Sequence, residues 1–495
     1  MTKLKLPIGI SDFKEVIEDG YHYIDKTLFV KDVVENGSKV LLFTRPRRFG
    51  KTINMSMLNY FLTSRKEEIN PSLFNKTLIN EDSEFCAKYQ NKYPVIFITF
   101  KGLKEDNYVD AESAIRGLVS RIYRDLSTEL ESSLSGIDLT TYISLKEKKS
   151  DKDDLKFSLA YLCKYYYQHT GKNIYLLIDE YDSPITAAYI HGYYNEMIDL
   201  MKNLLGEALK DNKYLAKGIV TGITRISQES IFSGFNNPDV YSMLRKDYGE
   251  YFGFTDSEVT KLLNDDAHPE QLADIKEWYN GYQVGPHTLY NPWSILNCVN
   301  QKYNYEAYWL NTSDNALIRR QLESSKATIR ESFIDLLQGK KTDRAVSDSL
   351  VFPDLAHDEE AIWSLLHSSG YLNISSTHRK GRRNIATLSI PNEEVKFIYD
   401  AIVEQWFSKV SSLSNYDKFA NSIASGDTYE FKQMMSAYLA ESGSYFDFNK
   451  SSSEQVFHTF MLGLVVGLRD KYIISSNQES GFGRYDLTLL PKDKS

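Results

Sequence analysis

A five-residue apolar run, a basic loop and an amphipathic helical pattern follow one another near the start of the chain, and they constrain its fold more than any other feature. Residues 40–44 (VLLFT) lack the polar alternation of a strand that faces water on one side. The loop that follows is RPRRFGK, and residues 52–64 carry apolar side chains at helical spacing. The pattern predicts a strand buried on both faces, then a tight loop and a helix.

Similar apolar runs recur along the first half of the chain, at residues 95–98, 174–178 and 215–220. Helical patterns, including residues 111–126 and 154–168, separate them. Strands that are buried on both faces and alternate with helices are typical of a parallel sheet flanked by helices. The chain has 495 residues, which is enough for about three domains. We therefore predict an α/β fold that begins with a parallel sheet.

The loop after the first strand has residue types that bind phosphate. Gly50 lets backbone N–H groups approach a phosphate, Lys51 can reach the β- and γ-phosphates, and the Thr52 hydroxyl can hold Mg²⁺ at the helix N-terminus. The full P-loop pattern has glycine where Arg45 stands, so the entry to the loop must differ, because arginine adopts positive φ less readily. The predicted cofactor-binding residues are Arg47, Arg48, Phe49, Gly50, Lys51 and Thr52.

Two acidic residues, Asp179 and Glu180, directly follow the apolar run at residues 174–178. A P-loop site needs an acidic residue on a neighbouring strand to complete the magnesium shell. Asp179 is predicted to orient Mg²⁺ or its waters, and Glu180 to polarise the attacking water as a general base. Asp182 is a possible additional acid. The alternative is an acidic turn without a chemical role.

The run at residues 215–220 continues toward three further candidates. If the sheet is ordered like that of other P-loop ATPases, this strand lies near the nucleotide. Thr221 or Thr224 can then contact the γ-phosphate or the attacking water, and Arg225 can neutralise charge in the transition state. The alternative for Arg225 is an ion pair with an acidic surface group.

Charge and hydropathy limit which partners the protein can bind and argue against a membrane or secreted protein. Lys and Arg total 58 against 67 Asp and Glu, a net charge of -9, so nucleic acid can be bound only through a local basic patch. No stretch of eighteen apolar residues occurs, and residues 1–7 lack the apolar core of a signal peptide, which predicts a soluble, cytoplasmic protein without a membrane partner. Cys86, Cys163 and Cys298 lie too far apart for a zinc signature and suggest no disulfide framework.

The sequence becomes helical and rich in aromatic residues after about residue 250. Within residues 359–390, a helix to residue 367, a strand at 371–375, a basic tip and a strand at 385–390 predict a winged helix. The tip, from His378 to Arg383 (HRKGRR), is a candidate for contact with nucleic-acid phosphates. A solvated hairpin tip is the alternative.

Six segments together resemble the AAA-ATPase-like family fused to a PD-(D/E)XK nuclease-superfamily domain, a group seen mostly in bacteria. They are LPIGISDF (6–13), YIDKT (23–27), LFTRPRRFGKT (42–52), IDEYD (178–182), WYNGY (278–282) and YWLNT (308–312). The resemblance implies that residue 45 is normally not glycine and that Asp25 and Lys26 lie beside the nucleotide base. The expected domains are an ATPase-like domain (1–250), a helical lid and winged-helix region (251–410) and a truncated nuclease-like domain (411–495).

The tail resembles the start of that nuclease domain. A helix at residues 454–468, carrying His458 as a packing residue, is predicted to precede strands at 472–475 and 485–490. The superfamily uses an Asp on one strand and a Glu-x-Lys on the next to hold a divalent metal. Asp486 fits the first role and Glu479 can assist, but no Glu-x-Lys follows in this sequence. We therefore expect no nuclease activity from this chain, and an unpaired sheet edge prone to pair with another chain.

These patterns favour a Mg²⁺-dependent P-loop ATPase that acts as a molecular switch toward an unidentified protein partner. Lys51, Glu180 and Arg225 are the predicted catalytic residues, and Thr52 and Asp179 the predicted metal ligands. Two alternatives stay open: a scaffold that nucleotide stabilises without turnover, and a DNA or RNA endonuclease if the tail is completed.

Overall fold

The computed structural model describes residues 4–226, 238–309, 317–318, 321, 327–337, 339–381, 383–399, 416–442, 468, 472–480 and 483–492. They belong to two compact units. The first combines Met1–Tyr305 with Ser347–Gly370, and the second combines Glu306–Val346 with Tyr371–Ser495. The three-domain division at residues 250 and 410 stays a prediction.

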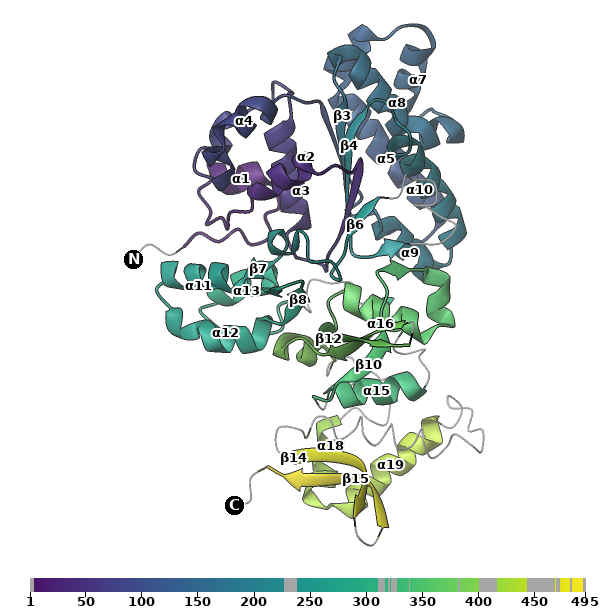
Figure 1. The fold of residues 1–495 in the computed structure, drawn as a ribbon. Coiled ribbons are helices and arrows are strands. Elements are labelled where there is room, and N and C mark those ends of the chain that lie inside the picture. Colours follow the sequence, from purple (N-terminus) through teal and green to yellow (C-terminus); the bar gives the residue numbers. More distant parts are fainter. Residues whose placement is uncertain are drawn as a thin grey trace. The chain divides into compact units, whose positions relative to one another are not determined.

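A parallel five-stranded sheet forms the centre of the first unit (Figure 1). Its spatial order is β2-β3-β4-β1-β6. The strands are β1 (Val40–Thr44), β2 (Val95–Thr99), β3 (Ile174–Asp179), β4 (Leu215–Gly222) and β6 (Asp239–Tyr241). The four strands predicted from apolar runs are confirmed. β4 lies between β3 and β1, and its expected place near the nucleotide stays a prediction.

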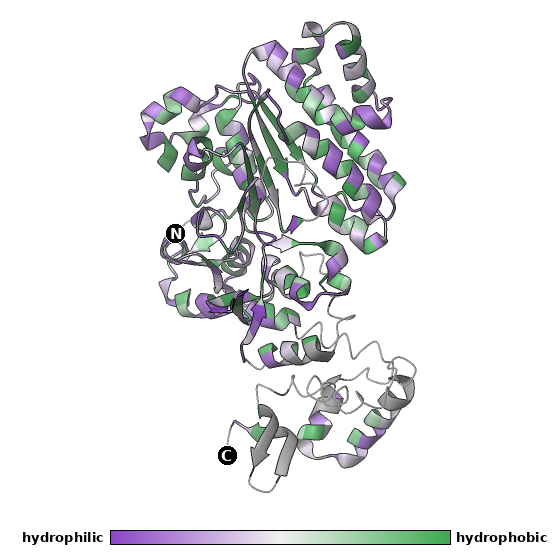
Figure 2. Ribbon diagram, turned by 45° about the vertical axis from the view of Figure 1, so that its right-hand side comes forward, coloured by the Kyte–Doolittle hydropathy of each residue, from purple (hydrophilic) through white to green (hydrophobic). Residues whose placement is uncertain are grey.

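Helices cover both faces of this sheet, which explains the apolar runs in β1 to β4 (Figures 1 and 2). Leu41 and Phe43 of β1 belong to one buried cluster with α2 and α3, while Val40 and Leu42 are buried as well and point to the opposite face. One side carries α1 (Phe13–Glu18), α2 (Leu28–Glu35), α3 (Lys51–Leu62) and α4 (Ser83–Tyr89). The other carries α5 (Tyr108–Asp125), α7 (Gly136–Lys146), α8 (Lys152–Thr170) and α10 (Tyr194–Leu209). The predicted helices at 52–64, 111–126 and 154–168 correspond to α3, α5 and α8.

A second small sheet and three helices follow β6 in the first unit. We call residues 242–253, which lead there from β6, the connector, and residues 254–300 the helical module. The module contains β7 (Phe254–Thr255), α11 (Asp256–Asp265), α12 (Leu272–Tyr279), β8 (Tyr282–Val284), β9 (His287–Tyr290) and α13 (Pro292–Asn300). Its antiparallel sheet has the order β7-β9-β8. Asn291 caps α13, and proline occupies the first helical position, where no N–H is needed.

Four further elements of the first unit matter for the site and for the predictions above. The short strand β5 (Arg225–Ile226) pairs in parallel with β11 (Ser349–Leu350). Two helices, α9 (Ser183–His191) and α16 (Glu359–Ser368), are also part of this unit. Among the described residues, no helix has the length and apolar character needed to cross a bilayer. Cys86, Cys163 and Cys298 are free.

The second unit contains an antiparallel sheet of order β10-β13-β12 and a separate hairpin. Its elements are α15 (Ala327–Leu337), β10 (Thr342–Ala345), β12 (Asn373–Lys380), β13 (Arg383–Ser389), α18 (Tyr416–Ser425), α19 (Thr428–Ser442), β14 (Tyr472–Ser480) and β15 (Gly483–Pro491). The helix and strands expected for a winged helix are present, but α16 belongs to the first unit and the strands to the second. The winged-helix and nuclease-like assignments therefore stay predictions. The predicted helix at 454–468 lies outside the described residues apart from Leu468.

Candidate functional site

The loop between β1 and α3 turns through two residues in the left-handed region. Gly50 has φ 82° and caps the start of α3, and Arg48 has φ 66°. A glycine adopts this conformation at little steric cost, whereas a non-glycine residue is uncommon there and must be held by its surroundings. The first N–H groups of α3 lack partners within the helix, so this end of the helix suits an anion.

Lys51 is buried at the start of α3 and reaches back across the loop. Its Nζ donates to the carbonyl oxygens of Arg45 (2.9 Å) and Pro46 (2.7 Å). Burial lowers the pKa of Lys51, and the nearby carboxylate of Glu180 opposes that shift. The ammonium therefore lies within the loop, close to the acidic end of β3, as a P-loop lysine would require.

Thr52 and Asp179 meet behind the loop although they are 127 residues apart in the sequence. The Thr52 hydroxyl donates to Asp179 Oδ2 (2.9 Å), and the Thr221 hydroxyl donates to Asp179 Oδ1 (2.6 Å). The more distant Thr99 hydroxyl also donates to Oδ2 (3.3 Å). Asp179 is fully buried. The acidic residue was expected on a strand that neighbours β1. In the structure β4 lies between β3 and β1, so Asp179 reaches Thr52 from a strand that is not adjacent to β1.

Glu180 directly follows β3 with a strained backbone. Its φ is 53°, in the left-handed region that costs a non-glycine residue about 1–2 kcal/mol. Burial raises the pKa of its carboxyl group, and the charge of Lys51 acts in the opposite direction. A carboxyl group with a raised pKa is a stronger base when ionised, which suits the predicted general base.

The contacts of Asp182, Thr224 and Arg225 in this structure are with other parts of the protein. Asp182 Oδ2 accepts hydrogen bonds from the N–H groups of Ile223 (2.8 Å) and Thr224 (2.9 Å), and from the Thr224 hydroxyl (3.2 Å). Arg225 lies 3.8 Å from Asp348 Oδ1. This contact is the ion-pair alternative considered for Arg225. The catalytic role of Arg225 stays a prediction.

Arg45 anchors the entry to the loop in a way that the sequence did not suggest. The side chain is fully buried, and Nη1 donates to the carbonyls of Thr44 (2.9 Å) and Tyr241 (2.6 Å). Nη2 donates to the carbonyl of Tyr248 in the connector (3.4 Å). Burial lowers the pKa of Arg45 to about 9. A guanidinium that binds backbone carbonyls thus occupies the place where the P-loop pattern has glycine.

The middle of the loop contacts the helical module. The Arg48 guanidinium lies 4.3 Å from the centre of the Trp293 ring, a cation–π contact. Phe49 is fully buried and meets Tyr282 edge to face at 5.0 Å. The N–H of Gly253 donates to the Phe49 carbonyl (3.1 Å), and a Cβ at Gly253 would lie 3.2 Å from the Phe49 ring. Only glycine fits this close approach, because φ is also 96°.

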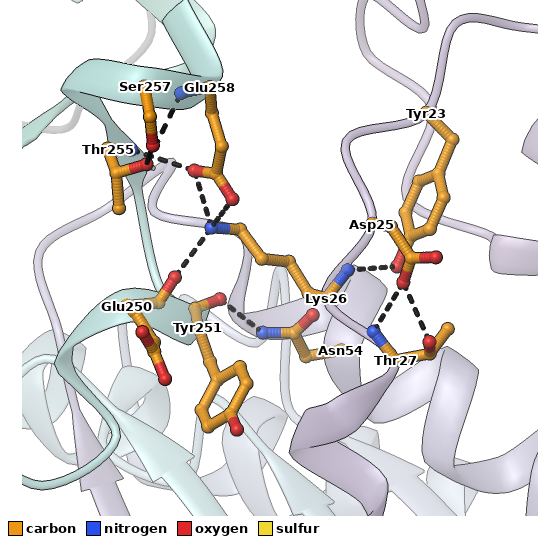
Figure 3. Close-up of polar contacts among 10 residues, drawn as sticks. All are labelled: Tyr23, Asp25, Lys26, Thr27, Asn54, Glu250, Tyr251, Thr255, Ser257 and Glu258. Carbon is orange, nitrogen blue, oxygen red and sulfur yellow. Dashed lines mark hydrogen bonds and ion pairs between the residues drawn. The ribbon is translucent and has the colours of Figure 1, made fainter. Parts of the chain in front are cut away.

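Asp25 and Lys26 are both engaged by the protein. Asp25 Oδ1 accepts hydrogen bonds from the N–H (2.8 Å) and hydroxyl (2.7 Å) of Thr27. The Lys26 ammonium binds the Glu250 carbonyl and the Glu258 carboxylate (Figure 3). Their expected place beside the nucleotide base stays a prediction. Arg47 is half-buried in the loop.

The described residues cover the candidates in the second unit only in part. The basic tip joins β12 to β13, where His378 lies 3.8 Å from Asp343, and Arg382 is outside the described residues. Glu479 and Asp486 lie on β14 and β15, but their side chains are not described. No group of three or more His, Cys, Asp or Glu side chains suited to a metal ion occurs among the side chains that the structure describes. The metal prediction therefore rests on Thr52 and Asp179.

Comparison with known proteins finds a family model that is similar to the first part of the chain. Residues 7–232 match the family model described as "Predicted AAA-ATPase". An Azotobacter chroococcum mcd 1 protein, named for its position in the vnfD 5' region, is 26% identical over 398 residues, which are 80% of this chain and 69% of that protein. The Walker-type ATPase paby2304 of Pyrococcus abyssi is similar with a TM-score of 0.38 and 14% identity, over 80% of this chain and 98% of that one.

The family match agrees with the resemblance found in the first part of the sequence. It places a predicted AAA-ATPase-like domain at residues 7–232, which include Lys51, Thr52, Asp179 and Glu180. The nuclease part of the resemblance lies outside this match and is not supported by it.

Proposed function

We propose that this protein binds ATP with Mg²⁺ at the phosphate loop and hydrolyses it, acting as a molecular switch. The observation that carries the proposal is the 2.9 Å contact between the Thr52 hydroxyl and the Asp179 carboxylate, at the end of the sheet where Lys51 closes the loop. The match of residues 7–232 to a predicted AAA-ATPase family supports nucleotide binding and hydrolysis in general.

The donor atoms at this place fit a magnesium ion. Mg²⁺ prefers oxygen ligands and usually keeps several waters, so one hydroxyl and one carboxylate, directly or through water, are a suitable protein contribution. Thr52 and Asp179 supply these atoms from α3 and β3. When bound, Mg²⁺ neutralises the charge that develops on the phosphate oxygens.

In this proposal the remaining work is done by residues of the chain. The N–H groups at the start of α3 and the Lys51 ammonium bind the phosphates, exchanging the carbonyls of Arg45 and Pro46 for phosphate oxygens. Glu180 accepts a proton from the attacking water. Thr221 holds Asp179 in its orientation through the 2.6 Å hydrogen bond.

The proposal is tested by steady phosphate release from the purified full chain, with Mg²⁺ and with a chelator. Lys51→Ala should abolish ATP binding and release. Lys39→Ala is a matched control, because Lys39 precedes the opposite end of β1 and donates to the Leu215 carbonyl. Hydrolysis by Lys51→Ala at the wild-type rate would exclude this site as the source of activity.

The same preparation separates hydrolysis from the scaffold alternative. A scaffold predicts that ATP raises the melting temperature through Lys51 while no phosphate is released. A switch predicts both the thermal shift and turnover. Contact of the basic tip with nucleic acid and a protein partner of the switch are part of the same proposal.

A further inference from the structure

The connector is fastened directly to the helix that begins at the phosphate loop. Asn54 lies on α3 two residues after Thr52, and its Nδ2 donates to the Tyr251 carbonyl (2.9 Å). In the loop before this helix, the Phe49 carbonyl accepts the hydrogen bond from Gly253. The position of the connector and that of the phosphate loop are therefore tied to each other.

The Lys26 side chain links this connector to the helical module (Figure 3). Its Nζ donates to the Glu250 carbonyl of the connector (2.5 Å) and to both carboxylate oxygens of Glu258 in α11 (2.5 and 2.7 Å). The three contacts match the three N–H donors of an ammonium group. Lys26 comes from the segment before α2, so it joins three parts of the first unit.

Glu258 has a second role at the start of α11. Its carboxylate accepts a hydrogen bond from the Thr255 N–H (2.8 Å), and the Thr255 hydroxyl accepts one from the Glu258 N–H. This reciprocal capping box fixes the first turn of the helix. The carboxylate is thus held in place before it meets Lys26.

Burial makes the pair sensitive to the loss of either partner. The Lys26 side chain is 9% exposed and that of Glu258 is 24% exposed. Burial lowers the pKa of Lys26, and Glu258 opposes this shift. Removal of one partner from a pair of this kind leaves an uncompensated charge in a poorly solvated place.

We infer that Lys26 and Glu258 are positioning residues for ATP hydrolysis, which fix the connector and through it Phe49 and the start of α3. The inference rests on the ATPase function proposed above. It gives Lys26 a role that requires no contact with the nucleotide, in contrast to the place beside the base implied by family resemblance. Loss of the pair is expected to loosen the loop and so lower the catalytic rate.

The test compares Lys26→Met, Glu258→Gln and the double variant of the full chain. Each single variant should lower kcat about tenfold to a hundredfold, the cost of a misplaced catalytic group. The double variant should lower it no further than the worse single variant, because both changes remove one interaction. Lys26→Arg keeps a cation facing Glu258 and should restore most of the rate. Lys31→Met is the matched control, because Lys31 forms a 2.6 Å ion pair with Asp82, which caps α4 and is not part of the connector.

Two kinetic results would overturn the inference. A normal kcat in Glu258→Gln, together with a raised KM for ATP in Lys26→Met, would place Lys26 at the nucleotide instead. Additive losses in the double variant would show that the residues act separately.

Hydrogen exchange of residues 48–58 without nucleotide gives a second measurement that does not depend on turnover. Glu258→Gln, the milder variant, should speed exchange there, while Lys31→Met should not. Unchanged exchange in Glu258→Gln refutes the inference. A wild-type chain without phosphate release refutes the ATPase proposal instead, so the two failures are distinguishable.

Discussion

Replacement of Glu180 by glutamine should separate ATP binding from ATP hydrolysis. The change keeps the size of a side chain that follows β3 at φ 53° and removes its ability to accept a proton. A general base contributes roughly a hundredfold to ten-thousandfold, so kcat should fall by that factor, equivalent to about 3–5 kcal/mol of barrier. Lys51, Thr52 and Asp179 keep their contacts, and the affinity for ATP should stay close to that of wild type.

The pH dependence gives a second test of the same residue. Burial raises the pKa of the Glu180 carboxyl group, so wild-type activity should decline as pH falls, beginning above the range of an exposed glutamate. Stability changes in the opposite sense. The raised pKa contributes stability that is fully present below the unfolded value of 4.5 and is lost as pH rises through the folded pKa. The glutamine of Glu180→Gln does not titrate, so the stability of this variant should not show the loss that wild type shows as pH rises.

The assays are phosphate release for turnover, calorimetric titration with ATP for binding and thermal unfolding from pH 4 to 8. Glu207→Gln, on the exposed surface of α10, is the control for loss of a carboxylate alone. A turnover rate in Glu180→Gln within threefold of wild type would show that another group accepts the proton.

Three further variants probe the site and its support. Thr52→Ala should raise the Mg²⁺ concentration for half-maximal activity about tenfold, while Thr52→Ser should not; equal values contradict the metal assignment. Phe49→Ala removes a fully buried ring at a cost of about 3–5 kcal/mol and should weaken ATP binding, measured by titration. Lys217 lies beside the end of α2, where its Nζ donates to the Val33 carbonyl. Burial lowers the pKa of Lys217 from 10.5 to about 8, and this difference in pKa corresponds to about 3 kcal/mol. As pH rises, the folded state loses this proton at a lower pH than the unfolded state does. The free energy of unfolding of wild type, measured by denaturant titration, should therefore rise by that amount relative to Lys217→Met between pH 8 and 10.5.

The central sheet and part of the site were predictable from local patterns. Apolar runs gave β1 to β4 because strands buried on both faces have no polar alternation. Asp179 was predictable because it ends such a run, and the structure brings it to Thr52. The strand β6 was missed, since three residues beginning with Asp239 do not form an apolar run.

The contacts that hold the loop in place were not predictable in the same way. Arg45 lies 196 residues from Tyr241, and Lys26 lies 232 residues from Glu258. Neither pairing leaves a local signal, because a basic residue in a loop is usually solvated. Arg45 suggested only a departure from a glycine pattern, and its burial among carbonyls depends on the connector.

The long sequence separations of these contacts determine how much of the chain is needed to fold a functional ATP site. The family match ends at residue 232, yet the carbonyls that bind Arg45, Lys26 and Asn54 belong to residues 241–251. During synthesis from the N-terminus, β1, the loop and α3 are complete long before these partners emerge. Contacts of such long sequence separation form late, because the intervening chain must first be closed into a loop. We therefore expect the segment matched by the family to be shorter than the autonomous folding unit, which extends at least through Glu258.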